Sequence, residues 1–213
     1  MWNRSREIFG HRDLIEEYQR RLCGAFPRAI NEDVRQVLQI VPLSKTNVLL
    51  SDGQTHELEN LIYGIEFEIQ LRSERLVIPR RLYFDEPDIT DEKRLTKRQK
   101  AILNCIYLCH HNGYVREKRL ACLDMTEYFS VPFTINLLGE YVIEILDVLE
   151  RKISDIDLGI YVQFIKENPQ FWQQTKSRIA SYWDAYYRYT FPLLNDYVGR
   201  RMEKKIAARL FDS

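Results

Sequence analysis

The stretch that decides the fold is VPFTINLLGEYVIEILDVLE, residues 131–150. Its apolar residues recur at alternating steps of three and four, which is the pattern of an amphipathic α-helix. Ser130 is a good N-cap residue, and Pro132 is harmless in a first helical turn because its missing N–H would have no helical partner there. We therefore predict one long helix here, with a buried stripe of Ile135, Leu138, Val142, Ile145 and Leu149 and a polar face of Glu140, Glu144 and Asp147.

The chain on either side of this stretch also predicts helices. Residues 95–109 repeat apolar side chains at helical spacing. Asn112 and Gly113 follow, and both tolerate the left-handed conformation that often ends a helix. Breaks at Asn168-Pro169 and at Pro192 divide the C-terminal part. The further helices predicted in this way cover residues 115–125, 158–167, 170–189 and 193–210.

The first ninety residues are less regular. One helical face combines Ile8, Leu14, Ile15, Tyr18 and Leu22 and ends near Gly24. A short helix is expected over residues 31–41, with Asn31 as its cap and Pro42 after its end, and Ser51-Asp52-Gly53 predicts a turn.

Residues 56–75 fit two patterns. Leu58, Leu61 and Ile62 begin a helical repeat, whereas residues 65–72 alternate strictly between apolar and polar side chains, which is typical of a strand. We favour one helix because the helical pattern is longer. Pro79 lies inside the next apolar stretch, so residues 76–87 are expected to form an extended connector rather than a central strand.

These patterns predict an all-α fold. The expected architecture is an irregular multi-helix bundle or a short HEAT-like array of helix pairs, with one small β-hairpin or an extended connector around residues 46–84. We expect a single helical domain over residues 1–213. A subdivision into N-terminal helices plus connector (1–90) and a C-terminal helical array (91–213) is the alternative.

The composition is that of an ordinary globular chain. Of the 213 residues, 45% are apolar and 29% are charged, and 31 basic residues balance 31 acidic ones. A net charge of zero provides no long-range field for a polyanionic partner. The sequence shows neither a secretory signal nor an apolar run long enough to span a membrane, so a cytoplasmic protein without integral membrane insertion is expected.

Motifs that would identify an enzyme are absent from the sequence. The chain has no Gly-rich phosphate loop, no G-x-S-x-G, no H-E-x-x-H and no Cys-x-x-Cys. We therefore expect no cofactor and no catalytic activity.

A metal site is one rival hypothesis. Cys105, Cys109, His110 and Cys122 could supply four ligands, either to a metal-dependent enzyme or to a metal-stabilised fold. Their spacing matches no familiar zinc pattern, and helical geometry places Cys105 and Cys109 within the apolar stripe. Both cysteines are therefore expected to be core residues.

A nucleic-acid site is the second rival. Basic residues open both helices of the hairpin around Asn112-Gly113 and could contact phosphates in a helix-turn-helix arrangement. The residues in question are Lys97, Arg98, Arg116, Lys118 and Arg119. Seven acidic residues against three basic ones in residues 101–150 weaken this hypothesis.

The C-terminal part suggests a surface for a protein partner. Its aromatic residues are of the kind that dominates protein–protein interfaces, and a basic amphipathic helix follows them. This surface would comprise Tyr182, Trp183, Tyr186, Tyr187, Arg188, Arg200, Arg201, Lys204 and Lys205. The function expected from the sequence is that of a helical protein-interaction or scaffold module.

Overall fold

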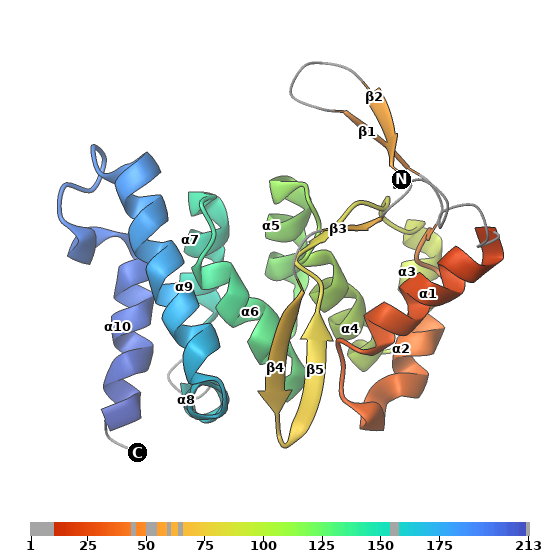
Figure 1. The fold of residues 1–213 in the computed structure, drawn as a ribbon, viewed down its shortest axis with the longest axis horizontal. Coiled ribbons are helices and arrows are strands. Elements are labelled where there is room, and N and C mark those ends of the chain that lie inside the picture. The colour runs from red at the N-terminus through yellow and green to blue at the C-terminus, as the bar shows by residue number, and fades with distance from the viewer. Residues whose placement is uncertain are drawn as a thin grey trace, which may run out of the picture.

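Helices form most of the structure, a computed structural model that describes residues 11–43, 46–49, 55–58, 61–63, 66–153 and 158–211. Figure 1 shows them following one another along the long axis of the molecule, from α1 and α2 at one end to α10 at the other. The predicted mostly α-helical fold is confirmed. The helices are α1 (His11–Cys23), α2 (Asn31–Leu38), α3 (Ile89–Arg94), α4 (Lys97–Tyr107), α5 (Gly113–Cys122), α6 (Val131–Leu138), α7 (Ile143–Lys152), α8 (Leu158–Glu167), α9 (Pro169–Tyr182) and α10 (Val198–Phe211).

In the described residues between α2 and α3, three short antiparallel pairings interrupt the helices. Strand β1 (Thr46–Leu49) pairs with β2 (Thr55–Leu58), β3 (Ile62–Tyr63) with β6 (Arg81–Leu82), and β4 (Phe67–Leu71) with β5 (Glu74–Ile78). A small hairpin in this region was expected. The turn predicted at Ser51-Asp52-Gly53 lies outside the described residues.

The predicted helix over residues 56–75 is wrong. Its apparent helical repeat combines residues that belong to separate strands, and the alternation in residues 67–71 is the pattern that the fold follows. Ile69 and Leu71 are buried while Gln70 is exposed, as the two faces of a strand require. Arg72 and Ser73 have φ angles of 51° and 68°, which a two-residue type I′ turn needs.

The predicted single helix over residues 131–150 is also wrong. Helix α6 ends at Leu138 and α7 begins at Ile143, because Gly139 leaves the helical conformation (φ −94°, ψ 34°). A Cβ atom on Gly139 would lie 2.5 Å from Nε of Arg178, so the chain turns where a side chain from α9 crosses it. Glu140, predicted on the polar face, is only 4% exposed.

Helix ends differ from the prediction at three further places. Asn112 does not end α4. It caps the N-terminus of α5, where its Oδ1 accepts a hydrogen bond from the Tyr114 N–H (2.9 Å). Asn31 is the first residue of α2 instead of its cap, and the Ser130 hydroxyl donates to the Glu127 carbonyl oxygen instead of capping α6. A π-helical turn at Trp183–Tyr187 follows α9, and a 3-10 turn at Leu194–Asp196 precedes α10.

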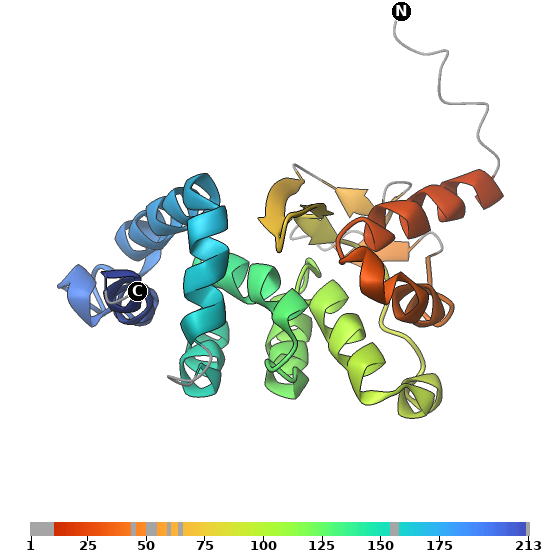
Figure 2. The ribbon, with the colours of Figure 1, turned by 90° about the horizontal axis from the view of Figure 1, so that it is seen from below.

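One connected cluster of buried apolar side chains runs from Tyr18 in α1 to Ile206 in α10. Cys105 and Cys109 belong to it, as the helical stripe predicted. Hairpin β4–β5 lies in the middle of the molecule, with α1 on one side and α9 on the other (Figure 1 and Figure 2). No helix in the described ranges is long and apolar enough to cross a membrane.

Candidate functional site

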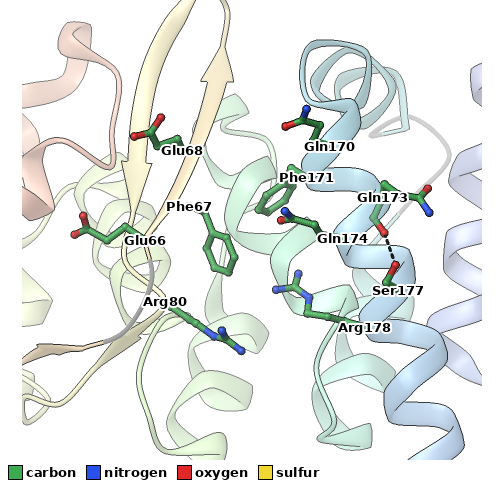
Figure 3. Close-up of a pocket in the computed structure, with 10 residues that line it drawn as sticks. All are labelled: Glu66, Phe67, Glu68, Arg80, Gln170, Phe171, Gln173, Gln174, Ser177 and Arg178. Atoms are coloured by element: carbon green, nitrogen blue, oxygen red, sulfur yellow. Dashed lines mark hydrogen bonds between the residues drawn. The ribbon is translucent and has the colours of Figure 1, made fainter.

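A groove of about 940 Å³ separates hairpin β4–β5 from helix α9. Figure 3 shows its two walls facing each other, with the strand residues on one side and successive turns of α9 on the other. The lining residues are Glu66, Phe67, Glu68 and Arg80 on the hairpin side and Gln170, Phe171, Gln173, Gln174, Ser177 and Arg178 on α9.

Aromatic rings form the floor of the groove. Phe67 meets Phe171 edge to face, with ring centroids 5.5 Å apart, and Phe171 meets Phe164 in the same way at 5.8 Å. The side chains alternate along β4, so Phe67 points toward α9 while Glu66 and Glu68 point to the other face of the strand (Figure 3). A bound chain would therefore meet apolar ring surface beneath it.

The edge of β4 that faces α9 carries backbone groups that do not pair with β5. At Gln70 a side chain satisfies them: the Gln70 N–H donates to Oδ1 of Asn168, and Nδ2 of Asn168 donates to the Gln70 carbonyl oxygen, both at 2.7 Å. Asn168 thus pairs with the edge much as a residue of a neighbouring strand would. The Arg72 N–H, further along the same edge, donates to the Glu167 carboxylate at 3.0 Å.

Among the described residues, the backbone N–H and C=O of Glu68 on the same edge have no hydrogen-bond partner. Backbone groups two residues apart point to the same side of a strand, so the Glu68 N–H and C=O face the same way as those of Gln70. The hairpin register supports this orientation. Val77 lies opposite Glu68, and its N–H donates to the Gly24 carbonyl oxygen (2.9 Å) and not to Glu68. Within the described part of the chain, no group bonds to the Glu68 N–H or C=O.

Positive charge gathers at one end of the groove. Arg80 is exposed and Arg178 is half-buried, and neither has a carboxylate within ion-pairing distance among the residues that the structure describes. Arg178 donates to the Thr175 hydroxyl (3.1 Å) and to the Asn136 carbonyl oxygen (3.4 Å), and its guanidinium lies over the Phe67 ring at 5.5 Å. Burial lowers the pKa of Arg178, and the charges of Arg80 and Arg81 act in the same direction, whereas the charge of Glu140 opposes this lowering.

The carboxylate nearest to this end is already engaged. Glu140 pairs with Arg81 at 2.9 Å and with Arg116 at 3.3 Å. Arg116 is 1% exposed and also donates to the carbonyl oxygens of His110 (2.6 Å) and His111 (2.9 Å). Arg81 and Arg116 therefore already pair with this carboxylate, while Arg80 and Arg178 add two further guanidinium groups to the groove, which leaves an excess of positive charge there.

The structure divides the predicted partner surface. Tyr182 and Tyr186 both contact Tyr141, each with ring centroids 5.8 Å apart, and Tyr186 is 61% exposed. Tyr187 instead stacks on buried Tyr197, and Trp183 donates to the Phe191 carbonyl oxygen at 2.8 Å. Trp183 and Tyr187 thus pack against the core. On the basic side, Arg188 pairs with Asp184, Arg200 with Glu203 and Arg201 with Glu150. Lys204 and Lys205 are exposed residues of α10.

The basic residues predicted for nucleic acid are all paired with carboxylates. Arg116 and Arg119 are 1% and 5% exposed, so neither guanidinium can reach a phosphate backbone from its present position. The pairs are Lys97–Asp124 at 2.7 Å, Arg98–Glu127 at 3.5 Å, Arg116–Glu140 at 3.3 Å, Lys118–Glu86 at 2.6 Å and Arg119 with both Glu86 and Glu92 at 2.6 Å.

The four residues of the metal hypothesis do not converge. Cys105 and Cys109 are buried in the core, whereas Cys122 is exposed at the end of α5. Buried His110 holds two backbone groups, the Phe84 carbonyl oxygen (3.0 Å) and the Asn112 N–H (3.1 Å). Over the described ranges, no three His, Cys, Asp or Glu side chains lie close enough together to hold a metal ion.

Comparison of the chain with protein-family models, with curated proteins and with solved structures finds no match. The sequence patterns do not indicate the groove. They predict Asn168 only as a helix stop and Phe67 as part of a helix. The alternation of residues 65–72 was the one signal that could have identified the strand edge.

Proposed function

We propose that the protein is an interaction module that binds an extended segment of a partner protein in the groove between β4 and α9. The segment adds as a strand to the open edge of β4. The observation that carries this proposal is the backbone of Glu68, whose N–H and C=O face the groove without a partner in the described residues, next to a position that Asn168 already pairs.

Strand addition suits the groove for physical reasons. Main-chain hydrogen bonds to an exposed edge supply affinity for any extended peptide, and pockets beneath alternate side chains supply specificity. Phe67 and Phe171 offer such an apolar floor, and the amides of Gln170, Gln173 and Gln174 on α9 offer hydrogen bonds to the opposite side of the segment. Each main-chain bond contributes roughly 1 kcal/mol, so the aromatic floor must add most of the remaining affinity.

The test is selection of binders from a random peptide library, followed by affinity measurements on two proline variants. Glu68→Pro removes the N–H that faces the groove. Arg75→Pro places a proline on β5, opposite Gln70, where the N–H points away from the groove. Both variants lose the same exposed Glu68–Arg75 ion pair (2.6 Å). The difference between them is therefore the edge of the hairpin that loses a backbone N–H donor.

We expect the selected peptides to bind about tenfold more weakly to Glu68→Pro and nearly unchanged to Arg75→Pro. Amide hydrogen exchange at Glu68 should slow when such a peptide binds to the unmodified chain. The proposal is wrong if the library yields no binder, or if both proline variants bind the peptides equally well.

A further inference from the structure

We infer that the arginine end of this groove, formed by Arg80 and Arg178, binds a carboxylate of the partner segment. The inference rests on the proposed function, since it assigns the chemistry of the ligand that the β4 edge receives. It starts from the two guanidinium groups that line the groove without a carboxylate partner in the described chain.

The surroundings of the Arg178 guanidinium favour the binding of an anion. Taking a guanidinium out of water is costly unless an anion or several hydrogen bonds compensate it. The direct contacts that compensate Arg178 in the described residues are a hydroxyl, a carbonyl oxygen at 3.4 Å and the face of Phe67, and the charge of Glu140 acts on it from beyond ion-pairing distance. Its Nε is buried without a hydrogen-bond partner. A carboxylate arriving in the groove would supply the direct ion pair that Arg178 lacks among the described residues.

The surrounding charges favour the same ligand. Glu140 could neutralise Arg178, but Arg81 and Arg116 already engage both of its oxygens. On β4, Glu66 already pairs with Arg21 (2.7 Å) and Glu68 with Arg75 (2.6 Å). The unpaired positive charge of the groove therefore lies at Arg80 and Arg178, so we expect the carboxylate of a bound segment at that end.

The geometry of the strand edge allows two sources for the carboxylate. The added segment must run from Glu68 toward the Arg80 end, because Asn168 occupies the edge at Gln70. A segment antiparallel to β4 would bring its own C-terminal carboxylate to this end. A segment parallel to β4 would place an Asp or Glu side chain there instead.

The test uses peptides selected on the unmodified protein, each made in three forms: unchanged, with an amidated C-terminus, and with its acidic side chains replaced by amides. Binding is measured to the unmodified protein and to Arg80→Gln, which removes one exposed charge. Arg151→Gln is the matched control, because Arg151 is an exposed arginine on α7 that does not line the groove. Arg178→Lys is added because it keeps the charge but loses the forked geometry.

We expect one of the two neutralised peptides to lose about tenfold in affinity, and we expect Arg80→Gln to cause a similar loss with the unchanged peptide only. Arg178→Lys should also weaken the binding of the unchanged peptide, whereas Arg151→Gln should not. Loss on amidation identifies a C-terminus, and loss on side-chain replacement identifies an acidic residue.

Two outcomes separate the inference from the proposed function. If Glu68→Pro weakens binding but neither neutralised peptide loses affinity, strand addition stands and the carboxylate site is wrong. If the neutralised peptides lose affinity while Glu68→Pro binds normally, the carboxylate site stands and strand addition is wrong. Equal losses in Arg80→Gln and Arg151→Gln would show only a general charge effect and would overturn the inference.

Discussion

Glu140 is a buried carboxylate that two arginines from different elements hold in place. Arg81 reaches it from β6 and Arg116 from α5, and Arg116 also ties it to the backbone at His110 and His111. A pair of this kind contributes little net stability compared with apolar packing, but removing one partner leaves a buried charge without compensation. The consequence can be measured at the level of single residues.

Replacing Glu140 with alanine should lower the free energy of unfolding by about 3–5 kcal/mol, because Arg116 would remain buried and unpaired. Chemical denaturation measures this change. The control is Glu150→Ala, which removes an exposed pair with Arg201 (2.8 Å) and should cost less than about 1 kcal/mol. Similar losses in the two variants would contradict the structural role of Glu140.

His110 predicts a pH dependence of stability. Burial lowers the pKa of His110 from 6.5 to about 4, and the charge on His111 contributes in the same direction. Its hydrogen bonds agree with a neutral ring, since Nδ1 accepts from the Asn112 N–H and cannot do so once protonated. The folded protein therefore resists a proton that the unfolded chain accepts.

Because the folded pKa lies below the unfolded one, the contribution of His110 is fully present above pH 6.5 and is lost as the pH falls toward 4. The total loss is roughly 3 kcal/mol, at one pKa unit per 1.4 kcal/mol. Denaturation curves across this range should become less pH-dependent in His110→Gln. An unchanged slope would show that other groups, such as His111, cause the acid sensitivity.

At the scale of elements, the break between α6 and α7 matters most. A continuous helix would gain from alanine at position 139, because glycine is a poor helix former. The observed packing makes the opposite prediction, since a Cβ there would lie 2.5 Å from Nε, 3.0 Å from Cβ and 3.1 Å from Cζ of Arg178. The groove and the helix break are therefore linked through one arginine side chain.

Gly139→Ala should destabilise the protein by about 1–3 kcal/mol, because Arg178 or the backbone must move. The matched control is Gly159→Ala in α8, where a Cβ would meet no atom of the described residues within 4 Å and should stabilise the helix by up to about 1 kcal/mol. Thermal or chemical denaturation of both variants decides the matter. Stabilisation by both substitutions would favour an uninterrupted helix over residues 131–150.

At the scale of the whole molecule, the two parts of the chain share contacts along their boundary. The Leu82 N–H donates to the Cys109 carbonyl oxygen and the His111 N–H to the Leu82 carbonyl oxygen, both at 2.9 Å. Gln99 in α4 donates to Asp33 in α2 at 3.0 Å. Together with the continuous core, these contacts favour one cooperative unit over two independent ones.

We therefore expect a single unfolding transition that tryptophan fluorescence and far-UV circular dichroism report alike. Trp172 and Trp183 report on α9 and the turn after it, whereas circular dichroism averages over all helices. A fragment of residues 91–213 should not unfold cooperatively, because it lacks the hairpin that packs on α8 and α9. Two separate transitions, or a cooperatively folding fragment, would support a subdivision at residue 90.

The sequence by itself determined most of the helical segments and their apolar stripes, but neither the strands within residues 56–75 nor the break at Gly139. Cys105 and Cys109 fell in the core as their spacing predicted, and Pro169 opened α9 where a helix boundary was expected. The reason is local: periodicity and chain-breaking residues act within a few turns, so a short window of sequence contains them. The HEAT-like comparison and the predicted tyrosine surface stay predictions.

Only the tertiary structure decided the rest. The sequence pattern predicts that Glu140 faces solvent. In the fold it is buried beside Arg81 and Arg116, which are 59 and 24 positions away in the sequence. The groove likewise joins residues 66–80 with residues 168–178, and its open edge depends on an asparagine from outside the hairpin. Periodicity indicates whether a face of a helix or strand is apolar or polar. It does not indicate which residue from a distant part of the chain packs against that face.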